Sequence, residues 1–345
     1  MPPWRMPAET EPHERTWMAF PRRNTTLGDT AADAEECYEA WTAVAHAILE
    51  FEPVTMVVDP VETDRARRML SAEIELLEAP LDDFWLRDSG PTFVRGEQGD
   101  LAAVDWIFNG WGAQDWAKWD RDRLLGRLVA EAAGAEVVPS TLVQEGGAVH
   151  VDGRGTVFVT ETVQLDPNRN PGATKGSVEA ELARTLGAER TVWLPRGLTR
   201  DYERFGTRGH VDMVLTVPAP GVVLLHRQTD AGHPDFAVTR LLRRVLEEET
   251  DATGEPWTIV EVPAPDTLRD GDGFVDWNYV NHLAVNGGVV ACSYGEARAD
   301  ARAREVLAAV YPGRRVVAVE ARPILARGGG IHCITQQQPA TTAAR

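Results

Sequence analysis

Cysteine is scarce in this chain of 345 residues: only Cys37, Cys292 and Cys333 carry a thiol, and none belongs to a CxxC pair. So few cysteines, odd in number, exclude a disulfide scaffold and a cysteine-rich zinc site as the basis of the fold. A chain without disulfides is typical of a reducing compartment, and we therefore predict a cytoplasmic protein.

Long apolar runs are missing as well. No stretch approaches eighteen apolar residues, and the segment Met1–Pro7 lacks the apolar core of a signal peptide. We therefore expect no membrane span and no membrane partner. Linkers and low-complexity segments are also absent, so we predict a single domain over residues 1–345, with a small polar tail at 340–345 that frays.

Positive charge is in short supply. The chain has 35 lysine and arginine residues against 53 aspartate and glutamate residues, which gives a formal net charge of −18. A surface of this sign repels nucleic acids and anionic membranes and weakly attracts small cations. The composition argues against a nucleic-acid partner, favours a small cationic substrate, and leaves the oligomeric state open, a homo-oligomer included.

What the chain does contain is a regular alternation of strand-like and helical segments. Short apolar runs predict strands at 54–58, 156–160, 222–225, 288–292 and 315–319. Apolar residues at three- and four-residue spacing predict helices at 31–50, 120–133, 177–186, 236–249 and 297–310. We expect Ser177 to be the N-cap of the third helix. The alternation indicates an α/β fold without a residue-level repeat, and it does not fix the topology.

Four segments place chemically active side chains beside apolar strands or glycine turns. They are Leu81–Thr92 with Asp88, Gln144–Asp152 with Glu145, Gly209–Asp212 with His210 and Asp212, and Gly328–Pro339 with Cys333. If Gly209–Asp212 is a strand, His210 and Asp212 lie on the same face. Each segment alone is explained by a solvated loop or turn. Together they supply a nucleophile, a base and spare carboxylates.

The surroundings of Cys333 favour a reactive thiol. Glycines 328–330 permit a tight turn and a close approach of the backbone. Backbone N–H groups near such a turn can stabilise a thiolate, so we expect that of Cys333 to be favoured. An inert core cysteine beside a glycine turn is the alternative for this residue taken alone.

Seven segments of this sequence resemble the agmatine deiminase family, within the superfamily of guanidine-modifying enzymes. They are Arg15–Pro21, Trp85–Pro91, Glu145–Gly153, Pro167–Pro171, Trp193–Gly197, Gly209–Asp212 and Gly329–Pro339. They follow the family's order, and the resemblance runs from about residue 5 to about residue 340. It implies a single-domain, five-bladed α/β propeller of ββαβ units, the pentein fold, with a central pocket and without metal or organic cofactor.

The resemblance also implies roles for five residues. Cys333 matches the family's nucleophile, His210 its general acid and base, and Glu145 the acid that orients the histidine. Asp88 and Asp212 match the carboxylates that bind the substrate guanidinium, a planar cation suited to paired hydrogen bonds. We therefore expect hydrolysis of agmatine to N-carbamoylputrescine and ammonia through a covalent thiouronium intermediate on the cysteine.

The sequence departs from the family before and after the His210 motif. The connection 198–208 is longer than usual and carries three arginines, and Met213 stands where the family usually has asparagine. We expect this loop to contact the substrate's far end. Candidates to hold a substrate ammonium are Asp201, Glu203 and Trp85. Candidates to hold a substrate carboxylate are Arg200, Arg204 and Arg208.

Other interpretations stay open. Arginine or another guanidino compound is the alternative substrate, and an amidinotransferase would pass the amidino group from the same cysteine to an amine. A non-catalytic binding protein is disfavoured by the intact set of five residues. A metal site from His210, Asp212, His332 and Cys333 has no recognised ligand spacing, so we predict none. Trp106, Trp111, Trp116 and Trp119 are interpreted as core residues; Trp85, three residues before Asp88, is the exception.

Overall fold

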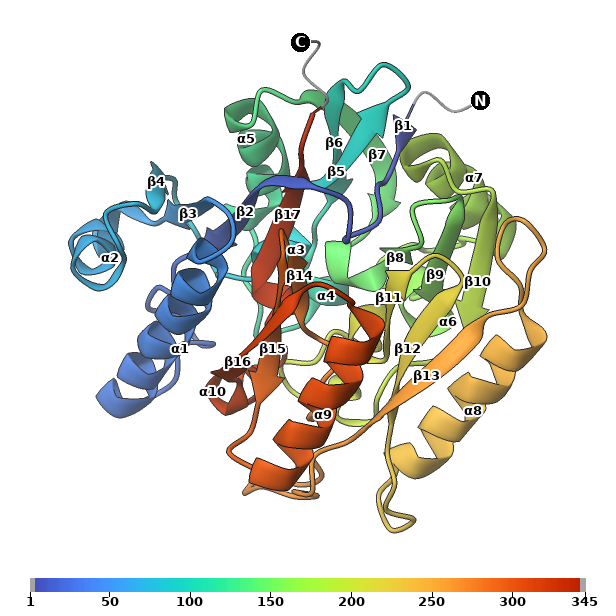
Figure 1. The fold of residues 1–345 in the computed structure, drawn as a ribbon. Coiled ribbons are helices and arrows are strands. Elements are labelled where there is room, and N and C mark those ends of the chain that lie inside the picture. Colours follow the sequence, from blue (N-terminus) through green and yellow to red (C-terminus); the bar gives the residue numbers. More distant parts are fainter. Residues whose placement is uncertain (1–3, 342–345) are drawn as a thin grey trace.

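Five small β-sheets lie around a common centre, with the longer helices on the outside (Figure 1), in a computed structural model that describes residues 4–341. Each sheet repeats one arrangement. A leading strand pairs antiparallel with a second strand, a helix follows, and a third strand runs parallel to the second. A parallel pair needs a crossover connection, usually helical, which explains the alternation of strands and helices in the sequence.

The strands divide among the five sheets as follows. The first sheet contains β17 (Thr335–Pro339), β2 (His13–Ala19), β3 (Val54–Val58) and β4 (Glu75–Glu78). The second contains β1 (Trp4–Arg5), β5 (Thr92–Gly96), β6 (Leu101–Ile107) and β7 (Glu136–Val143). The third contains β8 (His150–Val151), β9 (Thr156–Thr160) and β10 (Arg190–Leu194). The fourth contains β11 (Leu215–Ala219), β12 (Val222–Arg227) and β13 (Thr258–Pro263), and the fifth β14 (Leu283–Val285), β15 (Gly288–Ser293) and β16 (Arg315–Glu320).

Helices of three kinds join these strands. The crossover helices are α1 (Ala31–Leu49), α5 (Leu125–Ala132), α7 (Lys175–Leu186), α8 (Asp235–Glu248) and α9 (Ala297–Val310). Shorter α-helices are α2 (Thr63–Met69), α3 (Leu86–Ser89), α4 (Gly110–Ala113), α6 (Glu161–Gln164) and α10 (Arg322–Leu325). The 3-10 turns are η1 (Pro60–Glu62), η2 (Asp122–Leu124), η3 (Gly146–Ala148), η4 (Arg200–Tyr202), η5 (Val211–Met213) and η6 (His332–Ile334).

The ring is closed by the C-terminal strand. β17 is the leading strand of the first sheet and pairs antiparallel with β2, with Thr335 opposite Met18 and Gln336 opposite Trp17. The indole Nε1 of Trp17 also donates to Oε1 of Gln338 at 2.9 Å. Figure 1 shows β17 beside β2 near the middle of the molecule, and the turn that carries Cys333 directly precedes β17 in the chain.

The structure confirms the five predicted strands as β3, β9, β12, β15 and β16. Parallel strands covered on both faces have continuous apolar runs, as in β3, whose five residues are all buried. β16 is the exception, since it lies at the edge of its sheet and buries only Val319. The predicted five-bladed propeller is confirmed by the five sheets and their repeated connections.

Some local predictions were wrong. Gly209–Asp212 is not a strand, because residues 211–213 form the 3-10 turn η5. Ser177 is not the N-cap of α7; Thr174 is, and Ser177 is its partner in a capping box. The helix predicted over 120–133 begins as the 3-10 turn η2 and becomes α-helical only at Leu125.

In the part of the chain that the structure describes, no helix is both long enough and apolar enough to cross a membrane. Of the tail that we expected to fray, Ala340 is tied down, since its backbone N–H donates to the carbonyl of Pro12 at 2.8 Å. The remainder, residues 342–345, lies outside the described residues, as do residues 1–3.

Candidate active site

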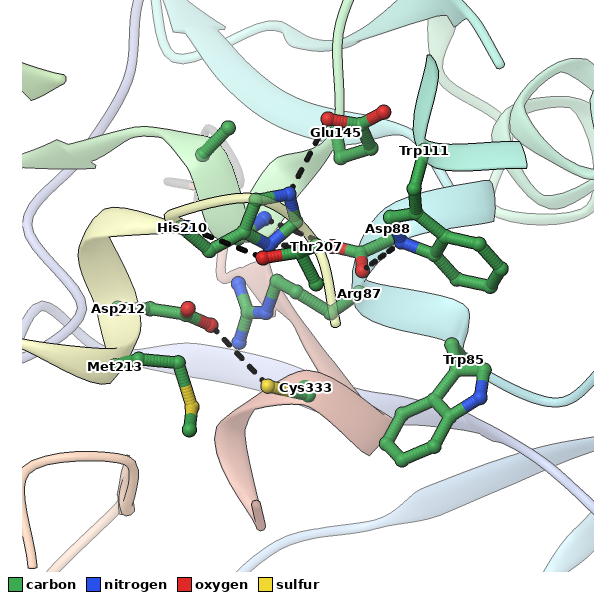
Figure 2. Close-up of polar contacts among 12 residues, drawn as sticks. Trp85, Arg87, Asp88, Trp111, Glu145, Thr207, His210, Asp212, Met213 and Cys333 are labelled. Atoms are coloured by element: carbon green, nitrogen blue, oxygen red, sulfur yellow. Dashed lines mark hydrogen bonds and ion pairs between the residues drawn. The ribbon is translucent and has the colours of Figure 1, made fainter. Parts of the chain in front are cut away.

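Each sequence-predicted active-site residue lies just before a leading strand. α3 carries Asp88 ahead of β5, and Glu145 immediately precedes η3 and β8. His210 immediately precedes η5, which carries Asp212 ahead of β11, and η6 carries Cys333 ahead of β17. Because the leading strands surround the centre of the ring, the four segments converge there, and the structure brings all five predicted residues together (Figure 2).

Gly147 leaves room where three polar side chains meet. A Cβ at this residue would lie 2.6 Å from His210 Nδ1, 2.9 Å from Asp212 Oδ2 and 3.0 Å from Asp88 Oδ1. Only a glycine permits this approach, since any side chain would collide with all three groups. Two of the surrounding atoms, His210 Nδ1 and Asp212 Oδ1, are buried without a hydrogen-bond partner. We use the word slot for this place, where the side chains of Asp88, His210 and Asp212 converge on the backbone of Gly147.

Asp88 forms one wall of the slot. Its Oδ2 accepts a hydrogen bond from Nε1 of Trp111 at 2.8 Å (Figure 2). Its Oδ1 accepts one from the backbone N–H of Gly147 at 3.0 Å. Burial, aided by the neighbouring charges of Asp212 and Glu145 and opposed by His210, raises the pKa of Asp88 to about 6. The carboxylate is therefore held in place and mostly ionised at pH 7, and it takes up a proton as the pH falls through about 6.

His210 stands between two carboxylates. Its Nε2 lies 3.2 Å from Oε2 of Glu145, and its Nδ1 lies 3.7 Å from Oδ1 of Asp88. Burial alone would lower its pKa, but Asp88 and then Glu145 outweigh burial and raise it to about 9. The imidazole therefore carries a proton, and hence a positive charge, at neutral pH.

Glu145 is fixed by a buried arginine that the sequence analysis did not single out. Nε of Arg169 lies 3.0 and 3.1 Å from the two carboxylate oxygens of Glu145, and both side chains are fully buried. Although burial would raise the pKa of Glu145, the charge of Arg169 lowers it below its ordinary value. Glu145 is thus an ionised group that points at His210.

Asp212 is supported from behind by a second histidine. Nδ1 of His332 lies 2.8 Å from Oδ2 of Asp212, and Nε2 of the same ring lies 2.9 Å from Oε2 of Glu9. Despite burial, the hydrogen bond and charge of His332 lower the pKa of Asp212. With Oδ2 held in this way, Oδ1 of Asp212 is left to face a ligand.

Cys333 is 3% exposed and lies against Asp212 and the fifth sheet. Its Sγ is 3.6 Å from Oδ2 of Asp212 and 3.2 Å from Nδ2 of Asn281. Burial, followed by the charges of Asp212 and Asp88, raises the pKa of the thiol well above its ordinary value. The expectation that the turn itself favours the thiolate was therefore wrong for the free protein, because two carboxylates outweigh the nearby N–H groups.

The residues predicted to bind the substrate's far end have different surroundings. Trp85 is 5% exposed, and its ring faces Gly329, the glycine that also faces Cys333 Sγ. The carboxylate of Asp201 is fully used inside its own loop. It accepts hydrogen bonds from Thr207 N and Oγ1, Gly209 N and His210 N at 2.6–3.0 Å. Asp201 therefore fixes the loop and His210 instead of reaching a ligand.

The remaining charges of this loop lie nearer the surface. Glu203 is exposed, and Arg208 is partly exposed with a left-handed backbone at φ 71°. Arg200 is paired with Asp270, with Nη1 2.6 Å from Oδ2. The guanidinium of Arg204 lies over the ring of Phe205, 4.5 Å from its centroid. Arg200 is thus neutralised within the protein.

One buried cluster has the spacing of metal ligands, but it differs from the set considered from sequence. Glu9, His150 and His332 place ligand atoms within 4.8 Å of one another, whereas His210 and Cys333 are not part of the group. Nε2 of His150 already accepts a hydrogen bond from the backbone N–H of Val217, and both nitrogens of His332 face carboxylates. The cationic side chain of Arg87 lines the same small cavity, so we interpret the cluster as an ion-pair network.

Sequence reasoning missed three side chains that contact the predicted residues: Trp111, Arg169 and Asn281. Trp111, interpreted as a core residue, is buried and also donates to Asp88. The fivefold repeat of strands and helices is the signal that could have identified Asn281. The fifth leading strand, β14, must also be preceded by a segment that enters the centre, and that segment contains Asn281.

Comparisons with known proteins agree with this geometry. The family model of the Porphyromonas-type peptidyl-arginine deiminases matches residues 5–339. A protein of Streptomyces coelicolor, provisionally named agmatine deiminase, is 51% identical over 98% of this chain and 99% of its own. The agmatine deiminase of Pseudomonas aeruginosa strain LESB58 is 41% identical over 98% of this chain and 96% of its own.

Solved structures give the same result. The structure of the agmatine deiminase of Enterococcus faecalis superposes with a TM-score of 0.91 and 33% sequence identity, covering 98% of this chain and 96% of that one. The matches in sequence and in structure extend over almost the whole chain and therefore include all five sheets of the ring. The chain therefore belongs to the Porphyromonas-type peptidyl-arginine deiminase family.

Proposed function

We propose that this protein is a guanidine hydrolase that converts agmatine into N-carbamoylputrescine and ammonia. The observation that carries the proposal is the slot above Gly147, where Asp88, Asp212 and His210 converge. A flat cation fits a site bordered by two carboxylates. The names of the relatives from Streptomyces, Pseudomonas and Enterococcus support agmatine as the cation.

In this proposal the guanidinium lies between Asp88 and Asp212, with Oδ1 of Asp212 accepting one of its N–H groups. The bound cation also changes the equilibrium between the thiol and thiolate forms of Cys333. In the free protein two carboxylates disfavour the thiolate, and a bound guanidinium neutralises their effect. The thiol therefore releases its proton to solvent as the substrate enters, so the nucleophile forms only when there is something to attack.

The chemical step then proceeds in two halves. The thiolate of Cys333 adds to the central guanidinium carbon, and His210, protonated at neutral pH, gives its proton to the departing nitrogen. Ammonia leaves, and an amidino group remains on sulfur as a thiouronium. Neutral His210 next takes a proton from water, and the hydroxide adds to the same carbon. The carbon–sulfur bond breaks, the hydroxyl proton returns to sulfur, and the ureido product is released.

Glu145 and Arg169 have positioning roles in this scheme. Glu145 keeps the ring of His210 oriented through Nε2, so that Nδ1 faces the slot. Arg169 keeps Glu145 ionised and immobile. We further propose that the whole chain forms one catalytic domain, since β17 joins the C-terminal turn to the first sheet. Cytoplasmic location and homo-oligomer formation stay predictions.

The substrate's far end is proposed to be cationic. A pocket of about 220 Å³ has Gly328 in its lining, and Gly328 is the neighbour of Gly329, which faces Cys333. Its lining includes the carboxylates of Glu203 and Asp276, and that of Asp272, whose Oδ2 lies 3.7 Å from Nη2 of Arg200. Its two arginines are already engaged, Arg200 with Asp270 and Arg204 over Phe205. Such a lining favours the ammonium of agmatine over the carboxylate of arginine.

The test is ammonia release measured with agmatine, arginine and methylated guanidines, with wild type and Cys333→Ser compared. We expect release from agmatine by the wild type and none by the variant. Mass spectrometry of a quenched reaction should find an amidino adduct on the peptide that contains Cys333. The matched control is Cys37→Ala, because Cys37 is buried in α1 outside the slot. Full activity in Cys333→Ser, or preference for arginine, contradicts the proposal.

A further inference from the structure

Asn281 occupies in the fifth sheet the place that Cys333 occupies in the first. It lies two residues before the leading strand β14, just as Cys333 lies two residues before β17. Four of the five sheets deliver a predicted active-site residue to the centre from this place in the repeat. The fifth delivers the fully buried side chain of Asn281.

The orientation of the Asn281 amide is fixed by the turn that carries Cys333. Its Oδ1 accepts the backbone N–H of His332 at 3.0 Å and lies 3.4 Å from the backbone N of Cys333. An oxygen facing two N–H donors cannot be exchanged for the amide nitrogen. Nδ2 is therefore the amide nitrogen, and it lies 3.2 Å from Sγ of Cys333, nearer than Oδ1, to which the thiol can donate at 3.5 Å.

The two hydrogens of Nδ2 have three acceptors within reach. Besides Sγ, they are the backbone carbonyl of Asp212 at 3.2 Å and Sδ of Met213 at 3.3 Å. A carbonyl is a good acceptor and keeps one hydrogen, whereas a thioether is a weak one. An anionic sulfur at Cys333 therefore takes the second hydrogen in preference to Met213, because hydrogen bonds to ions are the stronger kind.

A donor is needed at this point because the charges around Cys333 are mixed. The charged groups that act on it are Asp88 and Arg87 from α3 and Asp212 from η5, while its neighbour His332 in the same turn is directed to Asp212 and Glu9. The guanidinium of Arg87 is directed to Gln337, Gln336 and the carbonyl of His332. Nδ2 of Asn281 is thus a neutral side-chain donor in contact with the sulfur.

We propose that Asn281 is a catalytic residue that donates a hydrogen bond from Nδ2 to the Cys333 thiolate. The bond stabilises the anion against the nearby carboxylates of Asp88 and Asp212 and aims the sulfur at the slot above Gly147. Gly330 belongs to the same device, since a Cβ there would lie 2.5 Å from Oδ1 of Asn281. The catalytic role rests on the proposed function, but the hydrogen bond is a property of the free protein.

The experiment is alkylation of Cys333 by iodoacetamide, followed by peptide mass spectrometry in the absence of substrate from neutral to alkaline pH. Asn281→Asp preserves the shape of the side chain and replaces the donor by a carboxylate oxygen. We expect alkylation at a fixed neutral pH to slow at least about tenfold, which corresponds to a rise of about one pKa unit. Gly330→Ala displaces Asn281 without changing any ionisable group, and we expect it to slow alkylation as well. It is the second test of the hydrogen bond if Asn281→Asp does not fold.

Asn278→Asp is the matched control. It makes the same substitution in the same segment, and Nδ2 of Asn278 donates to the backbone carbonyl of Asp276 at 3.1 Å instead of to Cys333. We expect its alkylation rate to stay within about twofold of the wild type. Unchanged alkylation in both Asn281→Asp and Gly330→Ala, or an equal fall in Asn278→Asp, overturns the inference. If the wild-type protein releases no ammonia from agmatine, the proposed function is wrong. The alkylation result still tests the hydrogen bond from Asn281, because it is measured without substrate.

Discussion

Arg169 holds both carboxylate oxygens of Glu145, with Nε at 3.0 and 3.1 Å, at a place where neither side chain meets solvent. The same arginine donates from Nη2 to the carbonyl of Thr207 at 2.7 Å, and from Nη1 to Asp166 at 3.0 Å. It therefore ties the loop before His210 to the acid that orients His210. The buried guanidinium of Arg169 thus holds both Glu145 and the loop that precedes His210, the proposed general acid.

Arg169→Lys should lower kcat about tenfold or more and leave KM for agmatine nearly unchanged. A lysine carries the charge but cannot reproduce the planar contact with two oxygens, so Glu145 and His210 lose their alignment. The check is a double-mutant cycle with Glu145→Gln. If Arg169 acts through Glu145, adding Arg169→Lys to Glu145→Gln costs little more. Additive losses of kcat would show that Arg169 acts by another route.

Asp88→Asn and Asp212→Asn should each reduce kcat/KM for agmatine at least about tenfold. A hydrogen bond to a charged group contributes ~1.5–3 kcal/mol, and the amide removes the charge and turns part of the acceptor surface into a donor. The losses should differ in kind, since Asp212 also faces His332 at 2.8 Å and Cys333 at 3.6 Å. Asp212→Asn should therefore lower kcat as well as raise KM. Wild-type kinetics in both variants would place the guanidinium site elsewhere.

The dependence of kcat/KM on pH should contain limbs near pH 6 and pH 9, superimposed on the loss of the Cys333 proton that accompanies substrate binding. Asp88 has a pKa raised to about 6 and binds a cation only when ionised, so activity is lost as the pH falls through that value. His210 has a pKa raised to about 9 and gives a proton only when charged, so activity is lost as the pH rises through that value. Initial rates across this range test both limbs, and Asp88→Asn should abolish the acidic limb of its residual activity.

Asp276→Asn and Glu203→Lys should raise KM for agmatine, with kcat at saturation little changed. Asp276 is 6% exposed and burial raises its pKa to about 7, so a bound ammonium would favour its ionised form. Loss of a buried charge that pairs with a ligand costs ~2–5 kcal/mol. Butylguanidine, which lacks the ammonium, is the matched substrate and should be used equally well by variant and wild type. Arg208→Ala is the control in the same loop and should not impair agmatine use. Equal losses with both substrates would exclude this pocket as the ammonium site.

The sequence was most informative where chemistry requires a residue of one type in one place. Cys333 beside three glycines and Glu145 before a double glycine were both recognised, because these features are local. The structure explains why glycines occupy these positions, because a side chain would collide with its neighbours. A Cβ at Gly329 would meet Sγ of Cys333, and a Cβ at Gly147 would meet three polar groups. Regular elements were equally readable, since a buried strand such as β3 or a capped helix such as α1 is specified by its own residues.

Prediction was weakest where a property depends on residues distant in the chain. Asp201 is an acid in a loop by sequence, yet its carboxylate is consumed by Thr207, Gly209 and His210. The thiolate of Cys333 was expected to be favoured by its turn, but Asp88 and Asp212, from two other sheets, reverse that expectation.

By itself, the sequence determined the alternation of strands and helices, the inventory of reactive side chains and the family to which they belong. Only the tertiary structure decided which of these side chains act on one another. The reason is that a pKa, a hydrogen bond or a slot depends on distances across the ring, and β17 sets those distances when it pairs with β2 and closes it. Asn281 gains its contact with Cys333 only through that closure, which brings together residues 52 positions apart.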